Sequence, residues 1–270
     1  MTLCASVLLA LAVLQIAVAD RFEGKDVCRE NALNCADGDE SLPASHDTDK
    51  FNEQSNFLFQ SSVNGHAGIK QSLYNKLWNS NLDIAKETLK TDFLKRMDGN
   101  TLEAERYVIF MIQDLYYLVK VTHYINMIAM ELSGSSEKEL QTFFERRSNS
   151  YRKYTKYILD FYHITDISSI EPQTAIKDYV ESFSELLTEH PIYFAIAMLP
   201  CAKLWPFVAE NLNIKEGNPY YPFKRDNGDD NSRKHYEPLL KLYQDRLNQT
   251  KAFEIFRNQM KHEKSFFSSS

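Results

Sequence analysis

The stretch from Tyr107 to Met130 constrains the fold of this chain more than any other, because it is apolar on nearly every face. From Val108 onward it reads VIFMIQDLYYLVKVTHYINMIAM. In a protein that folds in water, a helix without a polar face marks a central element that other helices surround. The sequence therefore predicts a long helix over residues 107–130 at the centre of the molecule.

The rest of the chain also follows helical spacing. Glycine is scarce, with 8 residues among 270, and no segment shows the regular alternation with Asn-Gly or Asp-Gly turns that a β-sandwich needs. One clear amphipathic helix has its apolar side chains at the i, i+3, i+4, i+7 spacing: Ile176, Tyr179, Val180, Phe183, Leu186 and Leu187. We expect an all-α fold in a single domain over residues 63–270, without internal repeats.

The N-terminus carries a targeting signal. Residues 1–19, MTLCASVLLALAVLQIAVA, are uncharged and end in small residues at Ala17 and Ala19. These features are typical of a cleaved secretory signal peptide. An uncleaved membrane anchor is the alternative, although the run is short for a stable transmembrane helix. We expect cleavage after Ala19 and a secreted, extracellular protein that is not attached to a membrane.

An acidic segment follows the signal peptide. Residues 20–53 contain ten acidic and four basic side chains, a balance of −6 that equals the net charge of the whole chain. The remaining chain is nearly neutral and has no basic patch, so we expect no nucleic-acid partner. We assign residues 20–62 to an acidic extension ahead of the helical domain. In an oxidising compartment, Cys28 and Cys35 within this extension are expected to form a local disulfide.

Cys201 then has no cysteine partner, because Cys4 is removed with the signal peptide. It lies in AIAMLPCAKLWPF, residues 195–207, which predicts one buried helical stretch. Pro200 has no N–H, and its ring crowds the carbonyl four residues earlier, so we expect the helix to kink or loosen there. Trp205 lies one turn further on the same face as the thiol. A lone helical cysteine is more often an inert apolar residue than a nucleophile, but an idle thiol is a liability in an oxidising compartment, so both interpretations stay open.

Two carboxylates lie on otherwise apolar helix faces. Asp114 is in the middle of the 107–130 stretch, where an ionised carboxylate is costly unless it is paired or hydrogen-bonded. Glu263 falls on an apolar stripe of the last helix, which consists of Phe253, Phe256, Met260 and Phe267. Asp114 has a purely structural alternative, in which a neighbouring helix supplies its donors. Glu263 has one too, as an edge residue whose head group reaches water.

Three segments, in this order along the chain, resemble the TenA/thiaminase II family (TENA/THI-4/PQQC). Residues 91–118, TDFLKRMDGNTLEAERYVIFMIQDLYYL, are similar to the family's phenylalanine, DG(x)TL-like turn, Arg-aromatic pair and QDxYYL helix. The other two are LPC at residues 199–201 and EKSFF at residues 263–267, which resembles a Glu-x-x-Phe-aromatic motif. The resemblance implies the family's haem-oxygenase-like multi-helix bundle.

The resemblance also implies roles for individual residues. Cys201 matches the family's nucleophile, Asp114 its pyrimidine-holding carboxylate, and Glu263 its proton donor and acceptor. Three aromatic side chains are implied to line the substrate pocket: Tyr117, Tyr179 and Trp205, the last standing where the family usually has a tyrosine. We expect a polar loop over residues 218–235, NPYYPFKRDNGDDNSRKH, in place of aromatic residues that the family has downstream of the cysteine.

The implied chemistry is hydrolysis by a cysteine nucleophile. A thiolate adds to an electron-poor aminopyrimidine carbon, the glutamate protonates the ring or the leaving group, and the aspartate grips the amidine edge. We expect a secreted hydrolase of thiamine or of thiamine-derived aminopyrimidines, and such an enzyme would need a Cys201 thiol of low pKa. The alternative is a non-catalytic secreted protein that binds a small aromatic ligand in the same pocket.

The sequence favours no metal and no cofactor. It contains no HExxH, CxxC, GxSxG or GxxxxGK[ST] motif. A haem would need an axial ligand, and His66 is the one residue placed suggestively, although a single histidine near a helix start is usually polar surface. Family members commonly form homo-oligomers, which the sequence neither requires nor excludes here.

Overall fold

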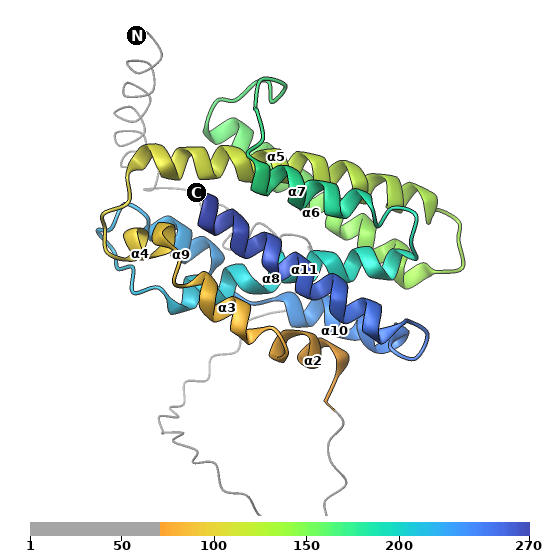
Figure 1. The fold of residues 1–270 in the computed structure, drawn as a ribbon. Helices are drawn as coiled ribbons and strands as arrows, with labels where there is room; N and C mark the ends of the chain where they lie inside the picture. Colours follow the sequence, from red (N-terminus) through yellow and green to blue (C-terminus); the bar gives the residue numbers. More distant parts are fainter. Residues whose placement is uncertain (1–70) are drawn as a thin grey trace, which may run out of the picture.

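The computed structural model describes residues 71–270, which form helices and connecting segments without any strand (Figure 1). The helices of this part are α2 (Leu73–Asn79), α3 (Leu82–Thr88), α4 (Asp92–Asp98), α5 (Ala104–Glu131), α6 (Lys138–Phe161), α7 (Thr174–Ser184), α8 (Pro191–Asn211), α9 (Tyr221–Asn227), α10 (Ser232–Tyr243) and α11 (Gln249–Ser269). The expected all-α fold is confirmed. The signal peptide, the acidic extension, the Cys28–Cys35 pair and His66 lie outside the described residues.

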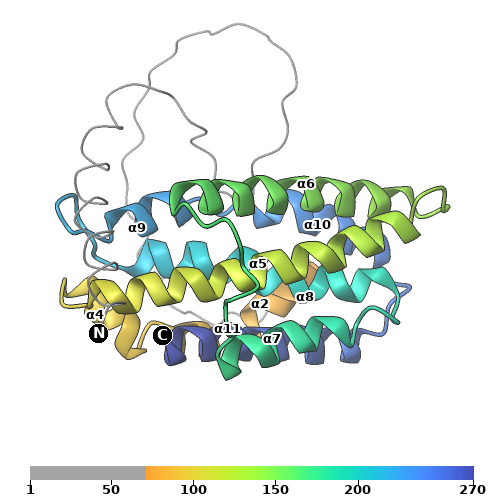
Figure 2. The same cartoon turned by 90° about the horizontal axis from the view of Figure 1, so that it is seen from above.

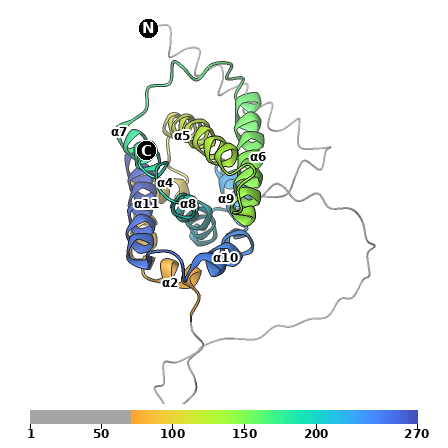
Figure 3. The same cartoon turned by 90° about the vertical axis from the view of Figure 1, so that its right-hand side faces the viewer.

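The long helices surround α8. In the end-on view, α5, α6, α7, α10 and α11 form a ring with α8 inside it (Figure 3). Helix α11 packs against α8, α7 and α3, while α5 packs against α6 and α7. Helix α8 also contacts α10, α9 and α3. A side chain on the middle of α8 therefore faces several helices at once.

The central helix is α8, and the prediction that residues 107–130 form the centre was wrong. Helix α5 does cover that stretch, but one side of it carries Lys120 and His123 in water, and Met130 is 77% exposed. These two polar residues and the methionine lie on a solvent-exposed face of α5. The apolar residues around them in the sequence made this face hard to recognise. Nearly every residue of α8, in contrast, is buried.

Helix α8 owes its start and its continuity to local features. Pro191 occupies the first turn, where its missing N–H costs nothing, and the His190 side chain accepts the free N–H of Ile192. The helix continues through Pro200, so the loosening expected beside the cysteine does not interrupt it. Within the described residues, α8 is the one helix long and apolar enough to cross a membrane, and 89% of that window is buried inside the protein. Its composition fits a core helix.

Helix α11 presents a second buried face to the centre. Asn248 caps its first turn by accepting the N–H of Lys251, and the helix then runs to Ser269. Most of the predicted apolar stripe is confirmed, because Phe256, Met260 and Phe267 are buried whereas Phe253 is only partly so. This face carries Glu263 into the interior.

Candidate active site

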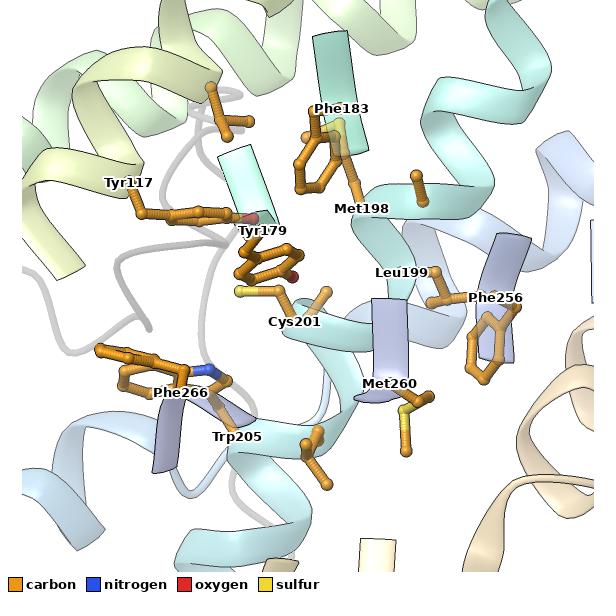
Figure 4. Close-up of a cluster of buried hydrophobic side chains, with 14 of the residues drawn as sticks. Tyr117, Tyr179, Phe183, Met198, Leu199, Cys201, Trp205, Phe256, Met260 and Phe266 are labelled. Carbon is orange, nitrogen blue, oxygen red and sulfur yellow. The ribbon is translucent and has the colours of Figure 1, made fainter. Parts of the chain in front are cut away.

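Three helices bring the predicted reactive side chains into one buried cluster. Cys201 is supplied by α8, Glu263 by α11 and Asp114 by α5, and their exposed fractions are 5%, 1% and 5%. In the close-up, Tyr117 and Tyr179 lie on one side of Cys201 (Figure 4). The cluster thus unites residues that are far apart in the sequence.

Glu263 is held by two hydrogen bonds, one on each carboxylate oxygen. The Tyr179 hydroxyl donates to Oε1 at 2.6 Å, and the Trp205 indole N–H donates to Oε2 at 3.0 Å. Burial raises the pKa of Glu263, whereas these two donors and the Cys201 thiol lower it. The interpretation of Glu263 as an edge residue that reaches water was wrong, because its head group is enclosed and fully bonded.

Cys201 faces the two carboxyl groups. It is the free cysteine of residues 71–270. Burial raises its pKa well above the usual value, and the charges of Glu263 and Asp114 raise it further. The expectation of a low-pKa thiolate was therefore wrong, because a buried sulfur beside two acids is more stable as the neutral thiol. Any reaction at this sulfur needs a base within reach, and Glu263 is in that position.

Asp114 differs from Glu263 in its surroundings. No described residue donates a hydrogen bond to its carboxyl group, so the structural alternative, in which a neighbouring helix caps it, finds no support. Burial, followed by the charge of Glu263, raises the pKa of Asp114 to about 8. At neutral pH this carboxyl group is therefore mostly protonated, and it offers one O–H donor and one acceptor. No described residue uses this donor and acceptor, so both are available to a ligand.

Aromatic side chains line the cluster. The rings of Tyr117 and Tyr179 are stacked, with centroids 4.8 Å apart and planes at 23°. The Tyr117 hydroxyl faces the Cys201 thiol and lowers its pKa, but it makes no hydrogen bond of good geometry. Trp205 stacks on Phe110 at 5.6 Å. The structure thus brings all six predicted site residues together.

Sequence reasoning missed two aromatic neighbours of the site, Phe110 and Phe223. Phe110 lies one turn before Asp114 and stacks on Phe266, the phenylalanine of the EKSFF motif, at 4.6 Å, and Phe223 lies 5.7 Å from Trp205. Phe110 lies in an otherwise apolar stretch, where nothing in the sequence singled it out. The expected polar loop at 218–235 was wrong, because α9 forms within it and buries Phe223 against the indole.

A known protein family matches the part of the chain that carries this cluster. The sequence model of the TENA/THI-4/PQQC family matches residues 81–270, which include Asp114, Cys201 and Glu263. The chain belongs to this family. No curated protein matches it.

Solved structures of TenA proteins share the fold. A TenA homologue from Pyrococcus furiosus has 19% sequence identity and a TM-score of 0.60, with 72% of this chain and 98% of the other covered. A TenA homologue from P. horikoshii OT3 has 19% identity and a TM-score of 0.60, with 73% and 97% covered. A protein from Silicibacter sp. TM1040, described as a TenA family transcription regulator, has 11% identity and a TM-score of 0.60, with 73% and 95% covered. The haem-oxygenase-like helical fold of TenA proteins is therefore confirmed.

The described residues contain no group of three or more His, Cys, Asp or Glu side chains that could hold a metal ion. The cluster described above offers two carboxyl groups, a thiol and aromatic rings. Proton transfer and nucleophilic addition are the reactions that such groups perform.

Proposed function

We propose that this TenA family member is a hydrolase of thiamine or of thiamine-derived aminopyrimidines, with Cys201 as its nucleophile. The proposal rests on one observation: the two buried acids differ in the hydrogen bonds that they receive. Glu263 receives two hydrogen bonds from Tyr179 and Trp205, whereas the Asp114 carboxyl group receives none. Carboxyl groups whose surroundings push their pKa values apart commonly take different roles in acid–base chemistry.

The neutral Asp114 carboxyl group suits the amidine edge of an aminopyrimidine. That edge has a ring nitrogen that accepts a hydrogen bond and an exocyclic amino group that donates one. A protonated carboxyl group offers the complementary pair, so two parallel hydrogen bonds can form. The ligand would thereby satisfy the polar group that the protein leaves without a partner.

Glu263 suits the role of base and acid. Its two donors favour the ionised form, which can take the proton of the Cys201 thiol as the sulfur adds to a carbon of the pyrimidine ring. The C–S bond forms and the S–H bond breaks. Glu263 then returns the proton to an amine leaving group as its bond to the exocyclic carbon breaks, whereas the thiazolium ring of thiamine leaves as a neutral thiazole and the proton goes to solvent. Water adds to that carbon as Glu263 takes one of its protons, and cleavage of the C–S bond with transfer of that proton to the sulfur restores the aromatic ring and the thiol.

This scheme explains why a raised thiol pKa is compatible with catalysis. The thiol stays neutral until a substrate is bound, and its proton moves only when the sulfur attacks. The aromatic stack of Tyr117 and Tyr179 would hold the pyrimidine ring in place for that step. A neutral resting thiol also resists oxidation, because the thiolate is the reactive form. That property suits the secreted location that the N-terminal sequence predicts and that we keep as part of the proposal.

A product assay tests the proposal. The full chain is incubated with thiamine, or with 4-amino-5-aminomethyl-2-methylpyrimidine, and the hydroxymethylpyrimidine formed is measured by chromatography. Cys201→Ser is expected to abolish turnover but to retain binding, and Asp114→Leu, which removes both the donor and the acceptor, is expected to weaken binding of both compounds. Turnover that survives in Cys201→Ser would refute the nucleophile. Ligand binding without any turnover in the unmodified protein would favour the alternative, a non-catalytic protein that binds a small aromatic ligand.

A further inference from the structure

Helix α11 begins at an asparagine whose sequence context has a second meaning. Residues 248–250 read Asn-Gln-Thr, which matches the Asn-x-Ser/Thr acceptor sequence, or sequon, for N-linked glycosylation. No other asparagine of the 270-residue chain is followed by this pattern. A sequon is modified in a chain that enters a secretory pathway, and the signal peptide predicted at residues 1–19 implies such an entry. The sequence thus supplies both the acceptor and the route to it.

All three residues of the sequon lie on the surface of the folded domain. Asn248, Gln249 and Thr250 are exposed, and the first buried side chain of α11 is that of Ala252. An N-linked glycan is bulky and hydrated, so a folded protein can carry one only where the asparagine faces solvent. The start of α11 meets this condition.

Three of the four polar atoms of Asn248 already have partners. The backbone N–H donates to the Tyr193 hydroxyl at 2.8 Å, which ties the residue to α8. The backbone carbonyl accepts the N–H of Ala252 at 3.0 Å, and the side-chain oxygen Oδ1 accepts the N–H of Lys251 at 3.2 Å. The remaining polar atom, Nδ2, has no hydrogen-bond partner among residues 71–270. This nitrogen is the atom to which an N-linked glycan is attached.

A glycan on Nδ2 is compatible with the helix cap. The bond from the Lys251 N–H fixes the orientation of the amide, because only its oxygen can accept a hydrogen bond. A glycosylated asparagine keeps that oxygen, so the cap is retained. Capping alone does not account for the whole sequon, since aspartate or serine would cap the helix equally well and the cap makes no use of Thr250. The Thr250 hydroxyl makes no hydrogen bond with a described residue.

We propose that Asn248 carries an N-linked glycan in the secreted protein. The donor is an oligosaccharide linked to a polyprenyl diphosphate. The bond between C1 of its first N-acetylhexosamine and the diphosphate oxygen breaks, and a bond between C1 and Nδ2 forms. Nδ2 gives up one proton to solvent, and polyprenyl diphosphate is the leaving group. The inference rests on the secreted location but is independent of the chemistry proposed at Cys201.

The glycan site is remote from the buried cluster. Glu263 follows Asn248 by fifteen residues, which corresponds to about 22 Å along the helix. Figure 2 shows α11 extending across the molecule from its connection with α10 to the C-terminus. Glycosylation and hydrolysis are therefore separate properties, and each can be measured whether or not the other is present.

The test expresses the full chain, with its own N-terminus, in cultured animal cells and treats the product with peptide N-glycosidase. The unmodified protein should migrate more slowly on a denaturing gel until the enzyme removes the glycan. Asn248→Asp keeps the capping oxygen but lacks Nδ2, so it should fold and migrate at the deglycosylated position. Thr250→Ala should also lose the shift. Thr250→Ser preserves the acceptor sequence and should keep the shift.

Peptide mass spectrometry locates the modification. Trypsin cleaves after Arg246 and Lys251, so the deglycosylated protein yields residues 247–251 as one peptide. Enzymatic release of the glycan converts the asparagine to aspartate, and this change should appear in that peptide. An unmodified chain without an enzyme-sensitive shift, whether secreted or retained in the cell, would overturn the proposal. A shift that persists in both Asn248→Asp and Thr250→Ala would also overturn it.

Discussion

Replacing Asp114 by asparagine should stabilise the protein increasingly as the pH rises. The carboxyl group has a pKa of about 8 in the folded protein, against an ordinary value of 3.8. Between these pH values the folded state binds more protons at this group than the unfolded state does. The stability of the unmodified protein therefore falls as pH rises through this window, because unfolding lets the group ionise in water. Asparagine has the same shape and does not titrate.

The size of the effect follows from the pKa difference. Each unit corresponds to about 1.36 kcal/mol, so the three units between pH 5 and pH 8 give roughly 4 kcal/mol at most. Local relaxation and water entry reduce the cost of a buried charge, so we expect roughly 2 to 4 kcal/mol. Between pH 5 and pH 8, the unfolding free energy of Asp114→Asn should therefore rise by that amount relative to the unfolding free energy of the unmodified protein.

Guanidinium denaturation of both proteins at pH 5, 6, 7 and 8 measures this gain directly. Glu263 is present in both, so its own titration largely cancels in the difference. If the stability difference between the two proteins were independent of pH, Asp114 would not have a raised pKa in the folded state. A variant that became relatively less stable at pH 8 would mean that the carboxylate has a donor, contrary to the geometry described above.

Three further predictions concern the neighbours of Asp114. Cys201→Ser should lower hydrolysis at least about a thousandfold, measured by product formation, while ligand affinity by calorimetry stays within a fewfold. Trp205→Phe removes one hydrogen-bond donor to Glu263 and should raise the pKa of Glu263, so the acid limb of the pH profile of kcat/KM should move to higher pH. Trp205→Tyr should move that limb less. A limb that does not move would argue against the indole hydrogen bond. Phe110→Ala should lower the unfolding free energy by roughly 3 to 5 kcal/mol in guanidinium, because Phe110 stacks on both Trp205 and Phe266, and a loss below 1 kcal/mol would contradict that packing.

The sequence predicted the fold class well, and the six candidate site residues that it singled out lie together in one buried cluster. Helical spacing with few glycines sufficed for an all-α fold, and the buried positions of Tyr179 and Phe183 on α7 followed from their periodicity. Asp114 and Glu263 drew attention because a carboxylate on an apolar face needs an explanation. Spacing alone did not decide between a structural and a functional explanation for these two carboxylates.

The structure decided points that depend on long-range packing. The place of α8 at the centre follows from the helices that surround it. Of the described helices α8 alone is apolar enough to cross a membrane, so its composition was a better sign of a central position than the apolar stretch of α5. The raised pKa of Cys201 arises from two acids that lie 87 residues before it and 62 residues after it in the chain. Phe223 belongs to the site because α9 folds back onto Trp205, and its polar flanking sequence gave no sign of that.

The partnership of Cys201 and Glu263 is the central claim, and thiol alkylation in Glu263→Gln tests it most directly. Iodoacetamide labelling at Cys201 is followed by peptide mass spectrometry against pH, alongside hydrolysis assays. Glu263 raises the thiol pKa, so its replacement by a neutral amide should lower that pKa and speed alkylation at neutral pH. Hydrolysis should nevertheless be lost, because the group that accepts and returns the proton is gone. A variant that keeps its hydrolysis, or whose thiol becomes slower to alkylate, would contradict the account.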